Sequence, residues 1–335
     1  MLLLQLSSLS MTRTVGLKHR FSTTLFPKPP FSFDSTVYVP HYFPTPDVNW
    51  KKGAYWQTLN WRGEALGIRM ENRGTANRPK IRLSVYSERR LTSQGLRDVA
   101  EELSWRYGLD EDISEFCKRF KRDSFLGQPL RRLEGMRLSC GNSLYELLII
   151  AIVLQNATVR RTVQMMNNLF NAYGKRLRFD SRELFAYWSP KDLSDVAEEG
   201  LRLLKVGYRA RMIKEISDAF SRGDIDEATL RHLAKEDAEK EFMKLYGVGP
   251  ATAQILLGGY LRRYDTFDLK GRLWEQKILS RLLFNRKLVP PRKITSLFER
   301  RYDEWRGLAF HYIFTDLFWR HKKNKMDWLE KEIRM

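Results

Sequence analysis

The sequence predicts an α+β fold in which a small antiparallel sheet precedes a larger helical region. Between residues 31 and 90, segments rich in β-branched and aromatic residues alternate with turn signals, as they do in antiparallel sheets. From about Leu130 onward the apolar residues instead recur with helical spacing. Because the predicted strands and helices are segregated along the chain, they favour an α+β arrangement over a regularly alternating one.

Length and composition limit both the fold and the function. The chain has 335 residues, enough for two compact lobes, and its hydrophobic content of 43% is that of a folded protein. Its 59 Lys and Arg residues outnumber 40 Asp and Glu, which gives a formal net charge of +19. Such a charge attracts polyanions and favours nucleic acid as a partner, without specifying any chemistry.

Cysteine and histidine usage argues against a metal centre. Cys117 and Cys140 are the only cysteines, too few for a disulfide framework or a cysteine-rich zinc site. The five histidines are scattered and have no metal-ligand spacing. We therefore expect no metal site.

The first thirty residues differ from the rest of the chain. They begin with a short apolar run at residues 1–9 and contain no acidic residue before Asp34. The run is too short to cross a membrane, and no other segment reaches that length. We interpret residues 1–30 as a disordered leader or as a misassigned start, with Met11 as the true first residue. Organelle targeting is a less favoured alternative. We expect a soluble, intracellular protein located with DNA.

Residues 31–130 are predicted to form the N-terminal α+β domain. Strand character is found at residues 36–40, 54–61, 65–70 and 80–86. Turn signals at 60–63 and 72–74 separate the last three segments, which predicts antiparallel pairing. Helices are then expected near residues 94–107 and 113–120, where apolar residues fall on one side.

Residues 131–335 are predicted to form an all-helical domain of two packed subdomains. The apolar spacing predicts helices near residues 143–155, 158–173, 191–199, 208–222, 228–233, 239–246, 250–260, 272–283 and 305–322. Between the helices at 239–246 and 250–260, Gly247 and Gly249 permit a tight turn, and Pro250 suits the first position of a helix. The N–H groups of this turn and the positive helix end point the same way. The hairpin can therefore bind a phosphate without a side chain.

This hairpin and three other segments resemble one known family. Residues 245–253 (LYGVGPATA) resemble the helix-hairpin-helix of the DNA glycosylase superfamily that includes AlkA-type and 8-oxoguanine-type base-excision enzymes. Residues 151–159 (AIVLQNATV), 204–212 (LKVGYRARM) and 305–313 (WRGLAFHYI) resemble further segments of that family and occur in its order. The resemblance covers roughly residues 140–320 and implies a helix-hairpin-helix core beside a small N-terminal sheet domain.

The resemblance implies a base-excision DNA glycosylase. Such an enzyme rotates a damaged base out of double-stranded DNA and cleaves its N-glycosidic bond. We expect a monomer that requires no cofactor, with room for a structural monovalent cation at the hairpin. The four-cysteine iron–sulfur cluster of endonuclease-III-like relatives is excluded, because it needs four thiolates. A non-catalytic protein that binds damaged DNA on the same scaffold is the alternative.

The resemblance also implies roles for individual residues. The hairpin residues expected at DNA are Gly247, Val248, Gly249, Ala251 and Thr252. The residues expected to reach DNA or to hold the vacated space open are Tyr208, Arg209, Arg211, Gln155 and Asn156. The alternative for Tyr208 is a surface aromatic beside a helix cap, and the alternative for Asn156 is a turn residue. Trp274 and Trp305 are the candidates that stack on the extruded base, unless they are core residues.

The catalytic positions depart from the family pattern. Breaking the glycosidic bond builds positive charge on the sugar, which a nearby carboxylate stabilises. The family keeps this Asp just past the second hairpin helix, where alignment on Leu273 and Trp274 places Lys270; Asp268 lies two residues earlier. Bifunctional members also carry a lysine two residues after the last hairpin glycine, where this chain has Ala251.

Three accounts of the chemistry follow from this departure. In the first, Lys270 is a nucleophile that forms a Schiff base and permits strand cleavage, with Asp268 as its partner. In the second, Asp268 takes the carboxylate role of a monofunctional glycosylase. In the third, catalysis is lost and Lys270 only contacts phosphate.

Overall fold

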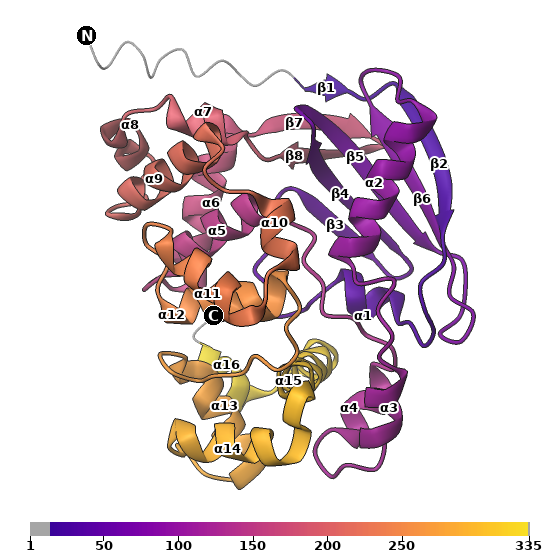
Figure 1. Ribbon diagram of the computed structural model, residues 1–335, viewed down its shortest axis with the longest axis vertical. Coiled ribbons are helices and arrows are strands. Elements are labelled where there is room, and N and C mark those ends of the chain that lie inside the picture. The colour runs from indigo at the N-terminus through magenta and orange to yellow at the C-terminus, as the bar shows by residue number, and fades with distance from the viewer. Residues whose placement is uncertain (1–13, 334–335) are drawn as a thin grey trace.

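The computed structural model describes residues 14–333 and places a five-stranded antiparallel sheet beside a larger helical region (Figure 1). The sheet has the strand order β2-β6-β5-β4-β3. Its strands are β2 (His19–Leu25), β3 (Val48–Lys51), β4 (Ala54–Trp61), β5 (Glu64–Asn72) and β6 (Ile81–Ser87). The turn from β4 to β5 is the predicted one, because Arg62 and Gly63 have φ of 47° and 81°, as a two-residue hairpin requires.

The core of the N-terminal domain lies between this sheet and one helix. Leu66, Ile68 and Met70 alternate along β5 and are fully buried. They share a core cluster with Val99 and Leu103 of α2 (Ser93–Arg106). The predicted α+β class of this domain is therefore confirmed.

Two predictions for the N-terminal region are wrong. The leader predicted at residues 1–30 is structured from residue 14 onward, since β2 pairs with β6 along its whole length; residues 1–13 lie outside the described residues. The strand predicted at 36–40 is replaced by the helix α1 (Phe33–Val37). In α1, Asp34 accepts hydrogen bonds from Trp50 Nε1 (3.0 Å) and Gly53 N (2.8 Å). Such tertiary contacts override the β propensity of the local sequence.

The first helical subdomain surrounds a core formed by residues between 140 and 261. Its helices are α5 (Leu144–Leu154), α6 (Val159–Tyr173), α7 (Pro190–Ser194), α8 (Glu198–Leu203), α9 (Arg209–Arg222), α10 (Glu227–His232), α11 (Lys235–Lys244) and α12 (Pro250–Ile255). A five-residue π-helix, η2 (Leu256–Tyr260), extends α12. The helix predicted at 191–199 is instead divided into α7 and α8.

A β-hairpin interrupts this subdomain, so the prediction of an all-helical region is wrong there. β7 (Lys175–Phe179) and β8 (Arg182–Ala186) pair antiparallel, and β1 (Val15–Gly16) pairs with β7 in parallel. Both strands are short and rich in charge, which hides them from periodicity. The hairpin packs on the sheet of the N-terminal domain, where Asp180 accepts hydrogen bonds from Trp56 Nε1 (2.6 Å) and Tyr86 OH (3.1 Å). Figure 1 shows β7 and β8 extending from the helices toward that sheet.

The C-terminal subdomain is assembled from two separate parts of the chain. It contains α13 (Leu273–Phe284), α14 (Pro291–Tyr302), the short η3 (Asp303–Trp305), α15 (Arg306–Lys323) and α16 (Asp327–Ile333). The earlier helices α3 (Ser114–Phe120) and α4 (Gly127–Arg132) share its core (Figure 1). The domain boundary predicted at residue 130 is therefore wrong, because residues 113–138 pack with helices that follow 267. Within residues 14–333, no helix has both the length and the apolar character needed to span a membrane.

One buried arginine connects three segments of the chain. Arg137 is 2% exposed. Its Nη1 donates to the backbone oxygens of Pro30 and Gly135, both at 2.9 Å. Its Nη2 donates to the backbone oxygens of Lys28 (2.8 Å) and Glu111 (2.9 Å). The guanidinium therefore holds the chain after β2, before α3 and after α4 at one point.

A methionine at this position should destabilise the protein strongly. Arg137→Met keeps the volume but leaves buried carbonyl oxygens without donors, so we expect the free energy of unfolding to fall by about 3 kcal/mol. The exposed neighbour provides a control, because Arg131→Met should change it by less than about 0.5 kcal/mol. Urea unfolding followed by circular dichroism measures both. Equal effects of the two substitutions would contradict the role assigned to Arg137.

An ionic network joins the N-terminal domain to the first helical subdomain. Arg231 of α10 donates to both carboxylate oxygens of Glu102 in α2, at 2.7 and 2.8 Å, and its guanidinium lies 3.5 Å from the ring centroid of Trp105. Arg106 also donates to Glu102, at 2.7 Å. Burial favours a raised pKa for Glu102, but the hydrogen bond from Arg231 and the charge of Arg106 outweigh it and lower the pKa to about 2.

This lowered pKa predicts a pH-dependent loss of stability. Because the folded-state pKa of Glu102 lies below the ordinary value of 4.5, its contribution is complete above about pH 4.5 and is lost as the pH falls toward 2. Glu102→Gln should therefore lower the free energy of unfolding by up to about 3 kcal/mol at pH 7, and by much less at pH 3. The exposed neighbour serves as control, since Glu101→Gln should show no such pH-dependent difference. Unfolding curves between pH 2.5 and 7 would test this.

Candidate active site

The glycine turn joins α11 to α12 in the geometry that the sequence predicts. Gly247 has the left-handed backbone conformation, with φ of 81°. Gly249 is the N-cap of α12, and Pro250 occupies its first turn. The first helical hydrogen bond of α12 runs from Ala253 N to the Gly249 oxygen, at 2.9 Å. The N–H groups that precede Ala253 therefore lie outside the helical ladder, where an anion can accept from them.

Only part of the predicted hairpin set presents a side chain to solvent. Val248 and Thr252 are 7% and 8% exposed, so both side chains face the interior. Ala251 is exposed at the start of α12. A contact of this hairpin with phosphate would thus be made by backbone N–H groups, as the sequence predicts, and the prediction that these residues lie at DNA stays open.

Several predicted residues meet on one side of the hairpin. Gln155, just after α5, donates from Nε2 to the oxygen of Gly247 at 2.9 Å. Asn156 donates from Nδ2 to the hydroxyl of Tyr208 at 3.3 Å. Tyr208 immediately precedes α9 and is 47% exposed. The end of α5, the start of α9 and the hairpin therefore form one hydrogen-bonded unit.

The two arginines beside Tyr208 have different environments. Arg209 is 7% exposed and donates to the oxygen of Gln155, with its guanidinium 4.6 Å from the ring centroid of Tyr208. The prediction that Arg209 reaches DNA is therefore wrong, because its charge is directed inward and braces Tyr208. Arg211 is exposed and lies 5.0 Å from the ring centroid of Tyr246, so its prediction as a DNA contact stays open.

Asp268 lies in the connection between the two helical subdomains. Its neighbours Phe267 and Leu269 are 8% and 1% exposed and belong to the C-terminal core, which anchors the segment. The Oδ1 atom of Asp268 accepts hydrogen bonds from Leu269 N (2.6 Å) and Lys270 N (3.1 Å). The carboxylate is therefore fixed just before α13.

Lys270 lacks this kind of constraint on its side chain. Its contact with Asp268 is made by the backbone N–H, and its side chain is exposed. Gly271 follows with φ of 76°, which turns the chain into α13. The two candidate catalytic residues are thus close in sequence, but only the carboxylate is held in place.

Aromatic and basic side chains meet next to this segment. Trp274 of α13 has its ring centroid 5.5 Å from that of Phe314 in α15. His41, between α1 and β3, contacts the same ring at 6.0 Å. The guanidinium of Arg272 lies 5.2 Å from the ring centroid of Phe310. Side chains from three distant parts of the sequence therefore form one surface.

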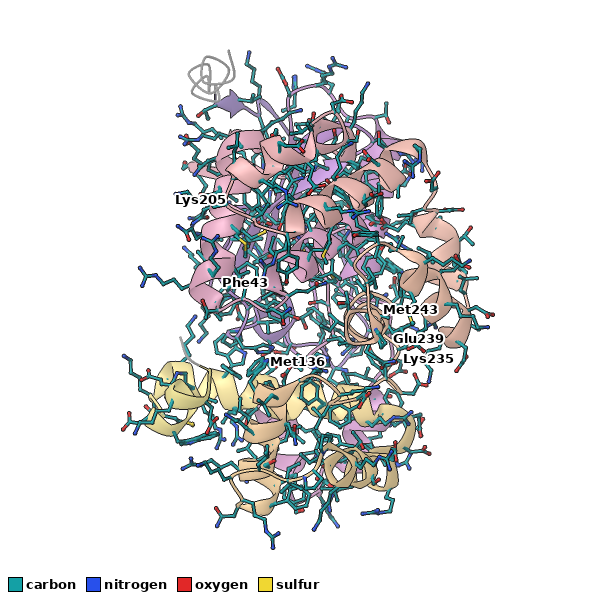
Figure 2. The ribbon with its side chains drawn as sticks, turned by 90° about the vertical axis from the view of Figure 1, so that its left-hand side faces the viewer. Phe43, Met136, Lys205, Lys235, Glu239 and Met243 are labelled. Atoms are coloured by element: carbon teal, nitrogen blue, oxygen red, sulfur yellow. The ribbon has the colours of Figure 1, made fainter. Side chains whose placement is uncertain are left out.

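We call this the junction surface, after the meeting of the N-terminal domain with the C-terminal subdomain. Its residues are His41, Tyr42, Arg272, Trp274 and His311. Tyr42 and Trp274 are 57% and 38% exposed, so their rings can stack on a ligand. In Figure 2, Phe43, the residue after Tyr42, is labelled in the lower part of the upper body, and Met136 is labelled where this body meets the lower one.

The two imidazoles of the junction surface are neutral at physiological pH. Burial, followed by the charge of Arg272, lowers the pKa of His41 to about 3. Burial, with His41 and Arg272 nearby, lowers the pKa of His311 to about 3 as well. A neutral imidazole carries one donor and one acceptor, so these rings act as polar groups without charge.

Trp305 is not part of this surface, which corrects the predicted base pocket. Its ring lies 5.5 Å from Phe116 of α3 and 5.7 Å from Tyr264, in the C-terminal core. Trp274 lies instead against Phe314 and Phe318. Both tryptophans lie near the starts of helices, and only the packing of α3 shows which one is enclosed.

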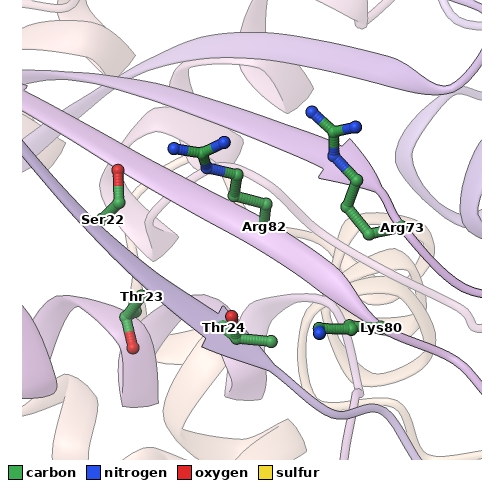
Figure 3. A pocket seen from close by; sticks show the side chains of 6 residues that line it. All are labelled: Ser22, Thr23, Thr24, Arg73, Lys80 and Arg82. Atoms are coloured by element: carbon green, nitrogen blue, oxygen red, sulfur yellow. The ribbon is translucent and has the colours of Figure 1, made fainter.

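Other surfaces add little to the candidate site. Within residues 14–333, no group of three or more His, Cys, Asp or Glu residues is placed to hold a metal ion. A groove at the edge of the sheet is basic, with hydroxyl groups from β2 opposite three cations (Figure 3). Its lining residues are Ser22, Thr23, Thr24, Arg73, Lys80 and Arg82, none of which belongs to the predicted site.

The fold and the hairpin define the class of the protein as a helix-hairpin-helix protein with an N-terminal sheet domain. The family described as HhH-GPD superfamily base excision DNA repair protein matches residues 149–326, more than half of the chain. The chain therefore belongs to the HhH-GPD superfamily of base excision DNA repair proteins. It is 24% identical over 262 residues to the DNA-3-methyladenine glycosylase of Bacillus subtilis (strain 168), covering 72% of this chain and 83% of that relative.

Solved structures share the fold over nearly the whole chain. The 3-methyladenine DNA glycosylase from Archaeoglobus fulgidus superposes with a TM-score of 0.73 at 18% identity, covering 88% of this chain and 98% of that one. The Clostridium acetobutylicum 8-oxoguanine glycosylase/lyase, in complex with double-stranded DNA, gives a TM-score of 0.63 at 18% identity, with coverages of 92% and 99%. At these identities the likeness establishes the fold.

The predicted family, fold class and base-excision role are confirmed by these comparisons. The individual site residues, the monomeric state and the cofactor expectations, including the monovalent cation, stay predictions. The sequence reasoning assigned no site role to His41, Tyr42, Arg272 or His311. None of these residues has a local signal, because the junction surface exists only after distant segments pack together.

The two hairpin glycines provide a matched test of the turn. An alanine Cβ at position 247 would have to tolerate a φ of 81° and would lie 2.9 Å from Met212 Cγ, so Gly247→Ala should lower the free energy of unfolding by about 1–3 kcal/mol. Gly249 has φ of −97° and an open Cβ direction, so Gly249→Ala should cost less than about 0.5 kcal/mol. Thermal unfolding compares them, and a larger loss from Gly249→Ala would contradict this geometry.

Proposed function

We propose that this chain is a DNA glycosylase in which Asp268 is the carboxylate that stabilises the cationic sugar. The observation that carries the proposal is the fixed position of its Oδ1, which accepts from two successive backbone N–H groups at 2.6 and 3.1 Å. Cleavage of an N-glycosidic bond builds positive charge on the sugar, and a nearby carboxylate lowers the energy of that state. A carboxylate that is already oriented needs no rearrangement when this charge develops.

The hairpin and the residues packed beside it would bind the duplex. Backbone N–H groups at the start of α12 would donate hydrogen bonds to a phosphate, aided by the positive end of the helix. The half-exposed ring of Tyr208 would fill the space left by the rotated nucleotide, with Asn156 bonded to its hydroxyl at 3.3 Å. The inward charge of Arg209 would keep this ring in place. The protein would act on double-stranded DNA as a monomer, and the carboxylate and a water molecule need no metal.

The junction surface would receive the extruded base. Trp274, at the start of α13, and Tyr42, after α1, both have exposed rings. Stacking between aromatic rings and a base contributes to holding it outside the duplex. The sugar of the same nucleotide would then lie toward Asp268, which precedes Trp274 in the same segment.

Lys270 is the candidate for a second activity. A lysine amine can attack the sugar carbon and form a Schiff base that permits strand cleavage, provided its pKa is depressed. Ala251 stands where bifunctional relatives carry their lysine, so Lys270 is the remaining amine of the predicted site. In our proposal base release depends on Asp268 and does not require Lys270.

Substitution of the two residues separates the accounts. Asp268→Asn keeps the side-chain shape but removes the charge, so single-turnover base release should fall by about 100- to 1,000-fold. Lys270→Ala should retain base release within about threefold, because it leaves the carboxylate in place. The measurement is base release from duplexes that carry alkylated, deaminated or oxidised bases, with strand cleavage followed on abasic duplexes as well. Full activity in Asp268→Asn would exclude Asp268 as the carboxylate.

Borohydride trapping tests the lyase account with the same proteins. A covalent adduct that disappears in Lys270→Ala would show that Lys270 forms a Schiff base, whereas an adduct that survives would exclude it. If no duplex of the panel reacts while binding persists, the protein is a damaged-DNA binder and the glycosylase proposal fails. Binding should weaken steeply with salt in either case.

A further inference from the structure

This inference rests on the proposed function and concerns the bases that the junction surface accepts. We infer that the junction surface selects a neutral base with carbonyl groups, such as a deaminated or oxidised base, over a cationic alkylated purine. The Bacillus subtilis relative, by contrast, is named for 3-methyladenine. It is carried by Arg272 and the two imidazoles beside it.

Arg272 is oriented by bonds within its own segment. Its Nε donates to Glu275 Oε1 at 2.8 Å, and its Nη1 donates to the backbone oxygen of Asp268 at 3.4 Å. The guanidinium side chain is 22% exposed. A guanidinium carries five N–H donors, and within residues 14–333 these contacts occupy two of them. Further donors are therefore available to a carbonyl oxygen of a base placed on Trp274.

The pKa values of the two imidazoles report the electrostatic environment of the junction surface. A protonated imidazole is a flat cationic ring, and an alkylated purine is another. Burial and the charge of Arg272 lower the pKa of both His41 and His311 to about 3, so this environment disfavours positive charge on a ring. A cationic base on the same surface would meet the same desolvation and the same guanidinium.

Two features of the surface act in the opposite direction. Aromatic faces attract cations, and the ring of His41 lies 5.0 Å from that of Phe318. Glu275 also offsets part of the charge of Arg272. The guanidinium of Arg272 nevertheless lies 5.2 Å from the ring centroid of Phe310 with its side chain 22% exposed, so a cationic base at this surface would meet a like charge.

The neutral imidazoles and the arginine together suit a base with polar edges. A carbonyl oxygen can accept from Arg272, and each imidazole can donate to or accept from a ring nitrogen. Uracil, hypoxanthine and 8-oxoguanine share this chemistry. Rotation out of the duplex costs least for a mispaired base. Deaminated bases are mispaired and also carry carbonyl groups, so they suit both the extrusion step and the junction surface.

Equilibrium binding of the Asp268→Asn protein tests the inference without relying on bond cleavage. The probes are duplexes with mispaired uracil, mispaired hypoxanthine, 8-oxoguanine or 7-methylguanine stabilised by a 2′-fluoro sugar. At least one neutral base should bind about tenfold more tightly than 7-methylguanine. In the Arg272→Gln background that preference should fall to within about twofold. Arg272→Lys keeps the charge, so it should still bind 7-methylguanine poorly. It lacks the planar guanidinium, so it should no longer distinguish one carbonyl base from another.

Controls separate specificity from folding and from the proposed function. Arg286→Gln removes the same charge from an exposed position after α13 and should leave the preference unchanged. Circular dichroism would show that each variant is folded. Tighter binding of 7-methylguanine than of every neutral base, or a preference unaffected by Arg272→Gln, would overturn the inference. Failure of the wild-type protein to release any base would remove the glycosylase proposal alone, because the binding preference is measured separately.

Discussion

The buried guanidinium of Arg137 is the contact on which the arrangement of the rest depends. A buried guanidinium needs hydrogen-bond acceptors, and both Nη atoms of this one, which is 2% exposed, donate to backbone oxygens from three separate segments. Its Nε has no partner among residues 14–333. The first of these segments continues through α1 to His41 and Tyr42, and the last leads from α4 into α5. The geometry of one arginine therefore sets how the N-terminal domain meets the C-terminal helices, and with it the shape of the junction surface.

Local signals predicted the hairpin well and the surfaces around it poorly. Gly247 and Pro250 have backbone requirements that can be read from their types alone, and the structure satisfies both, whereas Gly249 has φ of −97°, which other residues also adopt. The side chains of Arg209 and Trp305 have no such requirement. A long basic side chain can turn inward when a carbonyl lies behind it, and a tryptophan is enclosed or exposed according to a helix far away in sequence. Long-range packing decides both, so no periodicity could have assigned them.

The segment around Asp268 shows what spacing leaves open in a loop. Alignment on the apolar-aromatic pair at 273 and 274 placed Lys270 in the family's carboxylate position. In the structure, Phe267 and Leu269 are the anchors, and Asp268 between them accepts the backbone N–H groups of the next turn. In a loop, a residue's orientation depends on which neighbours are buried, and spacing counted from a downstream helix carries no such information. A similar limit applies to β2 and β7, since each pairs with a strand far away in the sequence, and β8 in turn pairs with β7.

The divided C-terminal core has a consequence for the order in which the protein can fold during synthesis. Apolar residues of α3 and α4, including Phe116, Phe120 and Leu130, share their core with residues that follow 267. The ribosome makes these early helices more than a hundred residues before their partners. Until synthesis is nearly complete, they stand as uncovered apolar surface on a nascent chain, while the sheet and the first helical subdomain can already assemble. A chain that stops short of α13 would carry this surface permanently and would be prone to aggregate.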